Sequence, residues 1–313
     1  MAGFVRVPRQ RFFGEWQPGT QRSAVIGPSR IRPGHCAAIR SRLSMHTHIF
    51  KYGGVIAMLC MLAMGWPLLV PLCANDLLPN STAGRFRIDN RLVIEDKTVK
   101  SVTIFDDGMV YDFIDDHGQI TIYNKSAGTF ILLDQSCRIK TLVATATLAE
   151  DFVRHKEAFR KSNNPFQNYL AEPFFEENAY EGESGLMYFR SPWVEYRFET
   201  VSLDDSVVSE AYYDFCRQFT LLNIRTSGFP TPMLRNELNP ILEQNRRFPG
   251  KVNMTLYPLG KVIISRVAIH AESTHTFVRR LQSPDEAKVA LANRYREVFR
   301  EVSLDDYLRE TRQ

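Results

Sequence analysis

Short segments that alternate polar and apolar residues dominate the chain between residues 84 and 143, and they restrict its fold more than any other feature. Examples are VKSVTIF, MVYDFI, QITIYN and TFILLD, all rich in Val, Ile, Phe, Tyr and Thr. A period of two in such residues is typical of β-strands. The linkers contain Asp or Asn with Gly, which is typical of hairpin turns because glycine adopts positive φ without a steric cost. The pattern predicts an antiparallel β-meander.

Acidic residues are crowded into this meander, and turn chemistry explains most of them. Asp107 and Asp116 lie in the linkers, where an Asp side chain hydrogen-bonds its own backbone. Asp112 instead lies within a strand, and its alternation with Tyr111 and Phe113 predicts that it faces solvent. A calcium-binding loop would need a Glu at its twelfth position, which this stretch lacks. The sequence therefore favours turn acids over a metal or catalytic cluster.

Helical periodicity replaces the period of two after residue 143. TLAEDFVRHKEAFRKS contains a predicted capping box at Thr147 and Glu150. Further helices are predicted in VVSEAYYDFCRQFTLLN, after an N-cap at Asn239, and after an N-cap at Ser283. Residues 186–203 resume strand character, and KVNMTLYPLGKVIISRVAIHAES reads as a hairpin. These patterns predict an α+β fold with a largely antiparallel, curved sheet and several covering helices.

A charge-free run, YGGVIAMLCMLAMGWPLLVPLC, occupies residues 52–73 and bears on the location of the protein. Taken from Met45, with Lys51 in a short basic flank, it is typical of a signal peptide. Its length also suffices for an uncleaved transmembrane helix, which takes about 20 apolar residues. Either interpretation leaves the part after residue 74 outside the cytoplasm, because positive charge stays inside. We therefore expect an exported protein that is periplasmic or membrane-anchored.

The cysteines offer two kinds of modification. VPLC is similar to a bacterial lipoprotein box, with Leu72 in place of the expected small residue, so Cys73 is a candidate for lipidation. Cys137 and Cys216 remain in the exported part, where an oxidising compartment allows a disulfide between them. They are equally compatible with two separate small apolar residues of a core.

Composition and charge divide the chain into five segments. Residues 1–44 are a disordered tail or lie upstream of the true start, 45–74 are the signal sequence or membrane anchor, 75–160 hold the β-meander and a helix, 161–185 form an irregular aromatic connector, and 186–313 form a second half that packs on the first. Residues 1–73 hold nine basic residues and one acid, which leaves 30 basic and 34 acidic residues in the remainder. The globular part therefore has no basic excess, and we expect no nucleic-acid partner.

No sequence motif for catalysis or cofactor binding is present. The chain lacks a P-loop, a GxGxxG turn, a GxSxG elbow and an HExxH helix. His270 and His275 flank Glu272 in HAESTH, and a strand that ends in a turn explains them as well as a metal site does. We therefore expect no catalytic, cofactor-binding or metal-binding residues and no cofactor, and we favour a function other than catalysis.

The order of a signal sequence and then VTIFDDGMVYDFIDDHGQITIYNKSAGTFILLDQSCRIKTLV resembles the lipoprotein-carrier-like proteins of bacterial envelopes, over residues 84–145. This resemblance implies a curved antiparallel half-barrel, covered by helices, that can hold an acyl chain. It carries over no site residues, and fold likeness alone does not assign a function. We expect a binding or carrier module for a lipid or another apolar ligand, with membrane contact through the N-terminal segment. The alternatives are a hydrolase with a site assembled from distant residues, and a structural envelope protein.

Export is testable with a reporter that works only outside the cytoplasm, fused after residue 75. We expect activity when translation starts at Met45, because the charge-free run then acts as the export signal. Replacing Leu59, Leu62 and Met64 with Asp should abolish it, since charges in the apolar core prevent insertion. A reporter that is active only in the cytoplasm would contradict the prediction.

Overall fold

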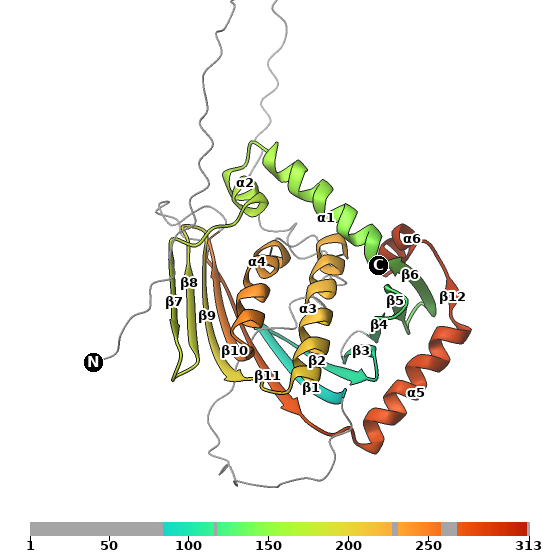
Figure 1. Ribbon diagram of the computed structural model, residues 1–313. Coiled ribbons are helices and arrows are strands. Elements are labelled where there is room, and N and C mark those ends of the chain that lie inside the picture. The colour runs from blue at the N-terminus through green and yellow to red at the C-terminus, as the bar shows by residue number, and fades with distance from the viewer. Residues whose placement is uncertain (1–83, 116–117, 227–230, 258–267, 312–313) are drawn as a thin grey trace, which may run out of the picture. The chain divides into compact units, whose positions relative to one another are not determined.

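The structure, a computed structural model, describes residues 84–115, 118–226, 231–257 and 268–311 (Figure 1). These residues form twelve strands, β1 (Arg85–Ile94), β2 (Lys97–Asp106), β3 (Met109–Ile114), β4 (Gln119–Asn124), β5 (Thr129–Asp134), β6 (Ile139–Ala144), β7 (Glu177–Glu181), β8 (Leu186–Arg190), β9 (Val194–Ser202), β10 (Arg247–Leu256), β11 (Ile269–Val278) and β12 (Arg300–Glu301). They also form six helices, α1 (Thr145–Arg160), α2 (Pro165–Ala171), α3 (Ser206–Thr226), α4 (Thr231–Gln244), α5 (Ser283–Val298) and α6 (Leu304–Glu310).

All twelve strands belong to one sheet, in the order β12-β6-β5-β4-β3-β2-β1-β11-β10-β9-β8-β7. Neighbouring strands are antiparallel except for β12, which runs parallel to β6. The two end strands do not pair with each other, so the sheet is open. The predicted α+β class with a largely antiparallel sheet is confirmed.

Strands β1 to β6 form the predicted meander, in which each strand pairs with the next in the chain. Asp107 and Gly108 join β2 to β3, and both have positive φ, of 46° and 87°. Asp and Gly tolerate this backbone better than other residues, so Asp107 is a turn residue as predicted. Asp116 lies outside the described residues, and its turn role stays a prediction.

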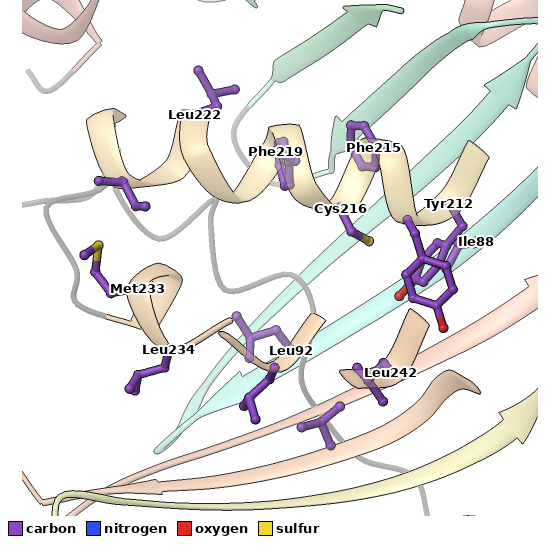
Figure 2. Packing of buried hydrophobic residues seen from close by; sticks show 14 of the residues in the cluster. Ile88, Leu92, Tyr212, Phe215, Cys216, Phe219, Leu222, Met233, Leu234 and Leu242 are labelled. Atoms are coloured by element: carbon purple, nitrogen blue, oxygen red, sulfur yellow. The ribbon is translucent and has the colours of Figure 1, made fainter. Parts of the chain in front are cut away.

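The sheet curves around α3 and α4, and the face toward these helices is called the concave face here (Figure 1). Every second side chain of a strand points to this face. Phe86 and Ile88 of β1 are examples, and both are buried in the larger core. Figure 2 shows buried side chains of α3 and α4, such as Phe219 and Leu234, between these helices and the strands. The predicted helix in VVSEAYYDFCRQFTLLN is confirmed as α3, whose Phe215 belongs to the same core.

Helix α5 packs on the opposite, convex face of the sheet. Tyr111 of β3 forms a second, smaller core with Ala292 and Phe299, which lie in and just after α5. An ion pair also joins α5 to β1, with 2.9 Å between Arg87 Nη1 and Asp285 Oδ1. Strands β2 to β5 are therefore covered by apolar side chains on both faces.

The capping box predicted at Thr147 and Glu150 is wrong, because α1 begins at Thr145. Its N-cap, Ala144, makes no side-chain hydrogen bond. Thr145 instead donates its backbone N–H and its hydroxyl to the Gly128 carbonyl, at 2.8 and 3.0 Å. The turn between β4 and β5 therefore fixes the start of the helix. The contact between Thr145 and Gly128 cannot be predicted from the residues next to Thr145 alone.

The N-caps predicted at Asn239 and Ser283 are also wrong. Helix α4 begins at Thr231 and continues through Pro240. Asn239 caps nothing, because its amide donates to the Thr220 hydroxyl of α3 at 3.3 Å. Burial of Leu238 and Leu242 on both sides of the proline outweighs the hydrogen bond that proline removes.

The capping box of α5 lies one residue upstream of the predicted position. Gln282 is the N-cap, and the backbone N–H of Gln282 donates to Asp285 at 2.9 Å. Asp285 also accepts from Arg87 of β1, so a contact distant in sequence selects Asp285 over Glu286 as the capping carboxylate.

The segment 161–185 is more regular than predicted, since it contains α2 and β7. Asn164 caps α2 by accepting from the backbone N–H of Phe166 at 2.9 Å, and Pro165 occupies the first turn. Strand β7 pairs with β8 and forms one edge of the sheet. Its exposed glutamates at positions 177 and 181 suit an edge, because charge discourages pairing with another chain.

Among the described residues, no helix combines the length and the apolar character needed to cross a bilayer. The predicted tail 1–44, the signal or anchor segment 45–74 and Cys73 lie outside the residues that the structure describes. The predictions for them stay predictions.

The loop before β8 provides a matched test of the fold. Gly185 has a φ of 69°, and a Cβ there would lie 2.3 Å from the carbonyl oxygen of Thr200. We expect Gly185→Ala to lower the free energy of unfolding by about 2 kcal/mol or more, through backbone strain and overpacking. Gly182→Ala, at a position with no neighbouring atom within 4 Å, should change it by less than about 0.5 kcal/mol. Equal urea midpoints for the two variants would contradict the described loop.

Candidate functional site

A chain of buried polar side chains crosses the concave face from β3 to β11. Thr103 of β2 donates its hydroxyl to Asp112 Oδ1 of β3 at 2.7 Å. Asn90 of β1 donates to Thr103 at 2.9 Å, and its Oδ1 lies 2.8 Å from Nδ1 of His275 in β11. The other ring nitrogen of His275 lies 3.1 Å from the Ser273 hydroxyl. These five residues are called the polar network here, and all are buried.

The prediction that Asp112 faces solvent is wrong. Asp112 is 2% exposed and points to the concave face with Val110 and Ile114, whereas Tyr111 and Phe113 point to the convex face. Because apolar layers cover both faces of β3, the alternation alone could not identify a solvent side. Burial raises the pKa of the Asp112 carboxyl to about 6, and the hydrogen bond from Thr103 opposes this shift. Its Oδ2 has no hydrogen-bond partner in the described part of the chain.

Hydrogen bonds join Ser273 to His275 and His275 to Asn90. A catalytic nucleophile, its base and the group that orients the base are joined in the same order. Burial lowers the pKa of His275 to about 3, with the charge of Arg235 acting in the same direction. An imidazole with so low a pKa is a weak base near neutral pH, and Ser273 has no exposed surface. The arrangement therefore suits a neutral structural network better than general-base catalysis.

Arg235 of α4 and Tyr196 of β9 bring two further polar groups to the concave face. The guanidinium carbon of Arg235 lies 5.4 Å from the centre of the Phe198 ring, a cation–π distance. The Phe198 and Tyr196 rings stack with their centroids 5.6 Å apart. The Tyr196 hydroxyl and Nη1 of Arg235 are both buried, and neither has a hydrogen-bond partner within the described residues. We call these two residues the Arg235–Tyr196 pair.

The charge of Arg235 reaches several groups of the interior. Burial raises the pKa of Tyr196, and it raises the pKa of the Cys216 thiol to about 12, while the Arg235 charge opposes both shifts. Across residues 84–311, as far as they are described, no carboxylate lies within ion-pair distance of this guanidinium. A partly buried cation without a counter-charge is costly, because burial removes water that would otherwise solvate it.

The structure does not bring Cys137 and Cys216 together, and both thiols are free. Cys216 is buried in α3 on the side toward the strands, where it packs as a small apolar residue (Figure 2). Cys137 is exposed in the turn after β5, and its backbone N–H donates to Asp134 at 2.9 Å.

The histidines of HAESTH lie on opposite faces of β11. His270 is exposed on the convex side, whereas His275 is buried on the concave side. Glu272, between them, forms an ion pair with Lys251 at 3.4 Å. In the described ranges, no group of three or more His, Cys, Asp and Glu side chains is arranged to hold a metal ion.

No protein-family model and no curated protein matches the chain. A functional hypothesis therefore depends on the interior side chains themselves.

The sequence itself contains a signal for Asn90 of the polar network. In RFRIDNRLVI, Asn90 interrupts the series of apolar residues at Phe86, Ile88 and Leu92 that share its face. A polar residue in such a series is unusual and indicates a buried hydrogen bond. Arg235 has no comparable signal, because TPMLRNELNPILEQ does not reveal which face of α4 meets the sheet.

Asp112 and His275 predict opposite pH dependences of stability. The raised pKa of Asp112, about 6, means that the folded state binds this proton more tightly than the unfolded chain. This term therefore lowers the free energy of unfolding as pH rises from about 4 to 6. The lowered pKa of His275, about 3, means that folding resists protonation. That term lowers the free energy of unfolding as pH falls from about 6 to 3.

We expect Asp112→Asn to remove the loss of stability between pH 4 and 6. We expect His275→Gln to remove the loss of stability between pH 6 and 3. The difference in free energy of unfolding between Asp112→Asn and the parent should be more favourable to the variant at pH 7 than at pH 4, by about 1 kcal/mol or more. His275→Gln should show the opposite order. Urea unfolding at the two pH values measures both, with the exposed Glu150→Gln as the control for loss of a carboxylate. The same pH difference in all three variants would contradict this assignment.

Proposed function

We propose that the protein is an exported binding or carrier module for an apolar ligand, with an acyl chain as the simplest ligand class. The charge-free run at 52–73 supports export. The curved sheet and the apolar layer between its concave face and α3 and α4 support the ligand class.

The contacts that fill the concave face are apolar and therefore replaceable. Phe105 of β2 meets Phe215 of α3 edge to face at 5.7 Å, and Phe130 of β5 meets Phe219 at 6.5 Å. Such contacts depend mainly on the area removed from water and little on direction. An acyl chain between the sheet and these helices would make the same kind of contact, and admitting one requires α3 or α4 to move away from the sheet.

One observation carries the proposal: beside the hydrogen-bonded polar network, the interior contains polar atoms that have no partner among the described residues. The Tyr196 hydroxyl and Nη1 of Arg235 both lie there. A buried donor that makes no hydrogen bond costs about 1–3 kcal/mol, so folded proteins rarely keep one without a partner. A bound molecule with a polar end and an apolar body would satisfy both the donors and the aromatic surface around them.

A hydrolase has less support. Ser273, His275 and Asn90 have a suitable order, but the low pKa of His275 and the complete burial of Ser273 argue against general-base catalysis. A purely structural envelope protein would not require unpaired donors in its interior.

The direct test is mass spectrometry of material released when the protein, purified without detergent, is denatured. We expect an acyl-containing molecule at about one per chain. After delipidation, the melting temperature should fall, and adding back the same molecule should restore it, because a ligand that binds only the folded state stabilises it. Absence of any acyl molecule, together with no thermal shift on adding fatty acids, would overturn the proposal.

A further inference from the structure

We infer that the Arg235–Tyr196 pair binds the head group of an anionic amphiphile with a single carboxylate, such as a free fatty acid. This inference rests on the proposed function and narrows it from any apolar ligand to one with a defined charged end. It also assigns a role to α4, which carries Arg235.

Each residue of the pair carries a buried hydrogen-bond donor, and both side chains contact the Phe198 ring. Nη1 of Arg235 and the Tyr196 hydroxyl are both without a partner in the described chain. Burial raises the pKa of Tyr196, so its hydroxyl stays protonated and donates at any working pH. A carboxylate has two oxygens, and guanidinium–carboxylate hydrogen bonds are short and strong because both groups are charged.

The charge of the pair favours a carboxylate over a phosphate. Arg235 is the one cation, among described residues, that shifts the pKa of Tyr196. A carboxylate carries a single negative charge and would neutralise this guanidinium. A phosphate monoester carries about −1.5 to −2 at neutral pH, which would leave a buried excess of negative charge.

The surroundings suit a ligand with a polar end near the surface and an apolar body inside. Arg235 is half-buried, so part of its side chain is open to solvent, whereas Tyr196 is fully buried. Met254 of β10 and Phe189 of β8 are the direct neighbours of Tyr196 across the sheet, and both are buried in the larger core. A head group at the pair would therefore direct an acyl chain along an apolar surface.

The test compares cis-parinaric acid with its methyl ester, two fluorescent probes with the same chain, on the delipidated protein. We expect the parent to bind the acid at least about tenfold more tightly, because charge-assisted hydrogen bonds are lost in the ester. Arg235→Met should remove this preference for the acid over the ester, and Tyr196→Phe should reduce it. Arg217→Met, which removes an exposed guanidinium of α3 that pairs with Glu243, is the matched control and should keep the preference.

The outcomes separate the two proposals. Equal binding of acid and ester by the parent would overturn the head-group inference and leave the carrier function intact. Binding of neither probe would overturn both. Tighter competition by tetradecyl phosphate than by myristic acid would overturn the choice of a carboxylate. Because the comparison of acid and ester uses the parent protein, the inference stays testable even if Arg235→Met does not fold.

Discussion

Apolar contact between the concave face of the sheet and helices α3 and α4 is the interaction on which the rest of this structure depends. A single open sheet exposes two faces, and it cannot bury the aromatic side chains of either without a covering layer. On the concave face Phe86 and Phe105 stack at 4.1 Å, and Phe105 meets Phe215 of α3. Each such pair adds about 0.5–1.5 kcal/mol beyond the burial of area. Helix α5 provides the second layer on the convex face of β2 to β5.

These two layers explain which parts of the fold could be predicted from the sequence. Strand segments, hairpin turns and α3 follow from periods and turn residues, which are local properties, and the structure agrees with them. The start of α1, the course of α4 through Pro240 and the capping of α5 by Asp285 depend on contacts with distant residues. The prediction that Asp112 faces solvent fails for the same reason, because apolar layers cover both faces of β3.

In the candidate site, too, some features follow from the local sequence and others depend on contacts between distant residues. Opposite faces for His270 and His275 follow from their odd separation in a strand, so the sequence alone could have excluded a shared metal site. The polar network needs the register of β1 with β2 and β11, which places Asn90 opposite His275. The Arg235–Tyr196 pair needs the packing of α4 on β9, which no local pattern encodes.

The central claim is that an acyl chain with a charged end binds between α3, α4 and the concave face. A crystal structure of the protein with a fatty acid brominated near its methyl end tests this most directly, because bromine gives an anomalous signal. We predict bromine between these helices and the strands around β9 to β11, with the carboxylate at Arg235 and Tyr196. Bromine on the convex face beside α5, or a carboxylate away from Arg235, would contradict the account.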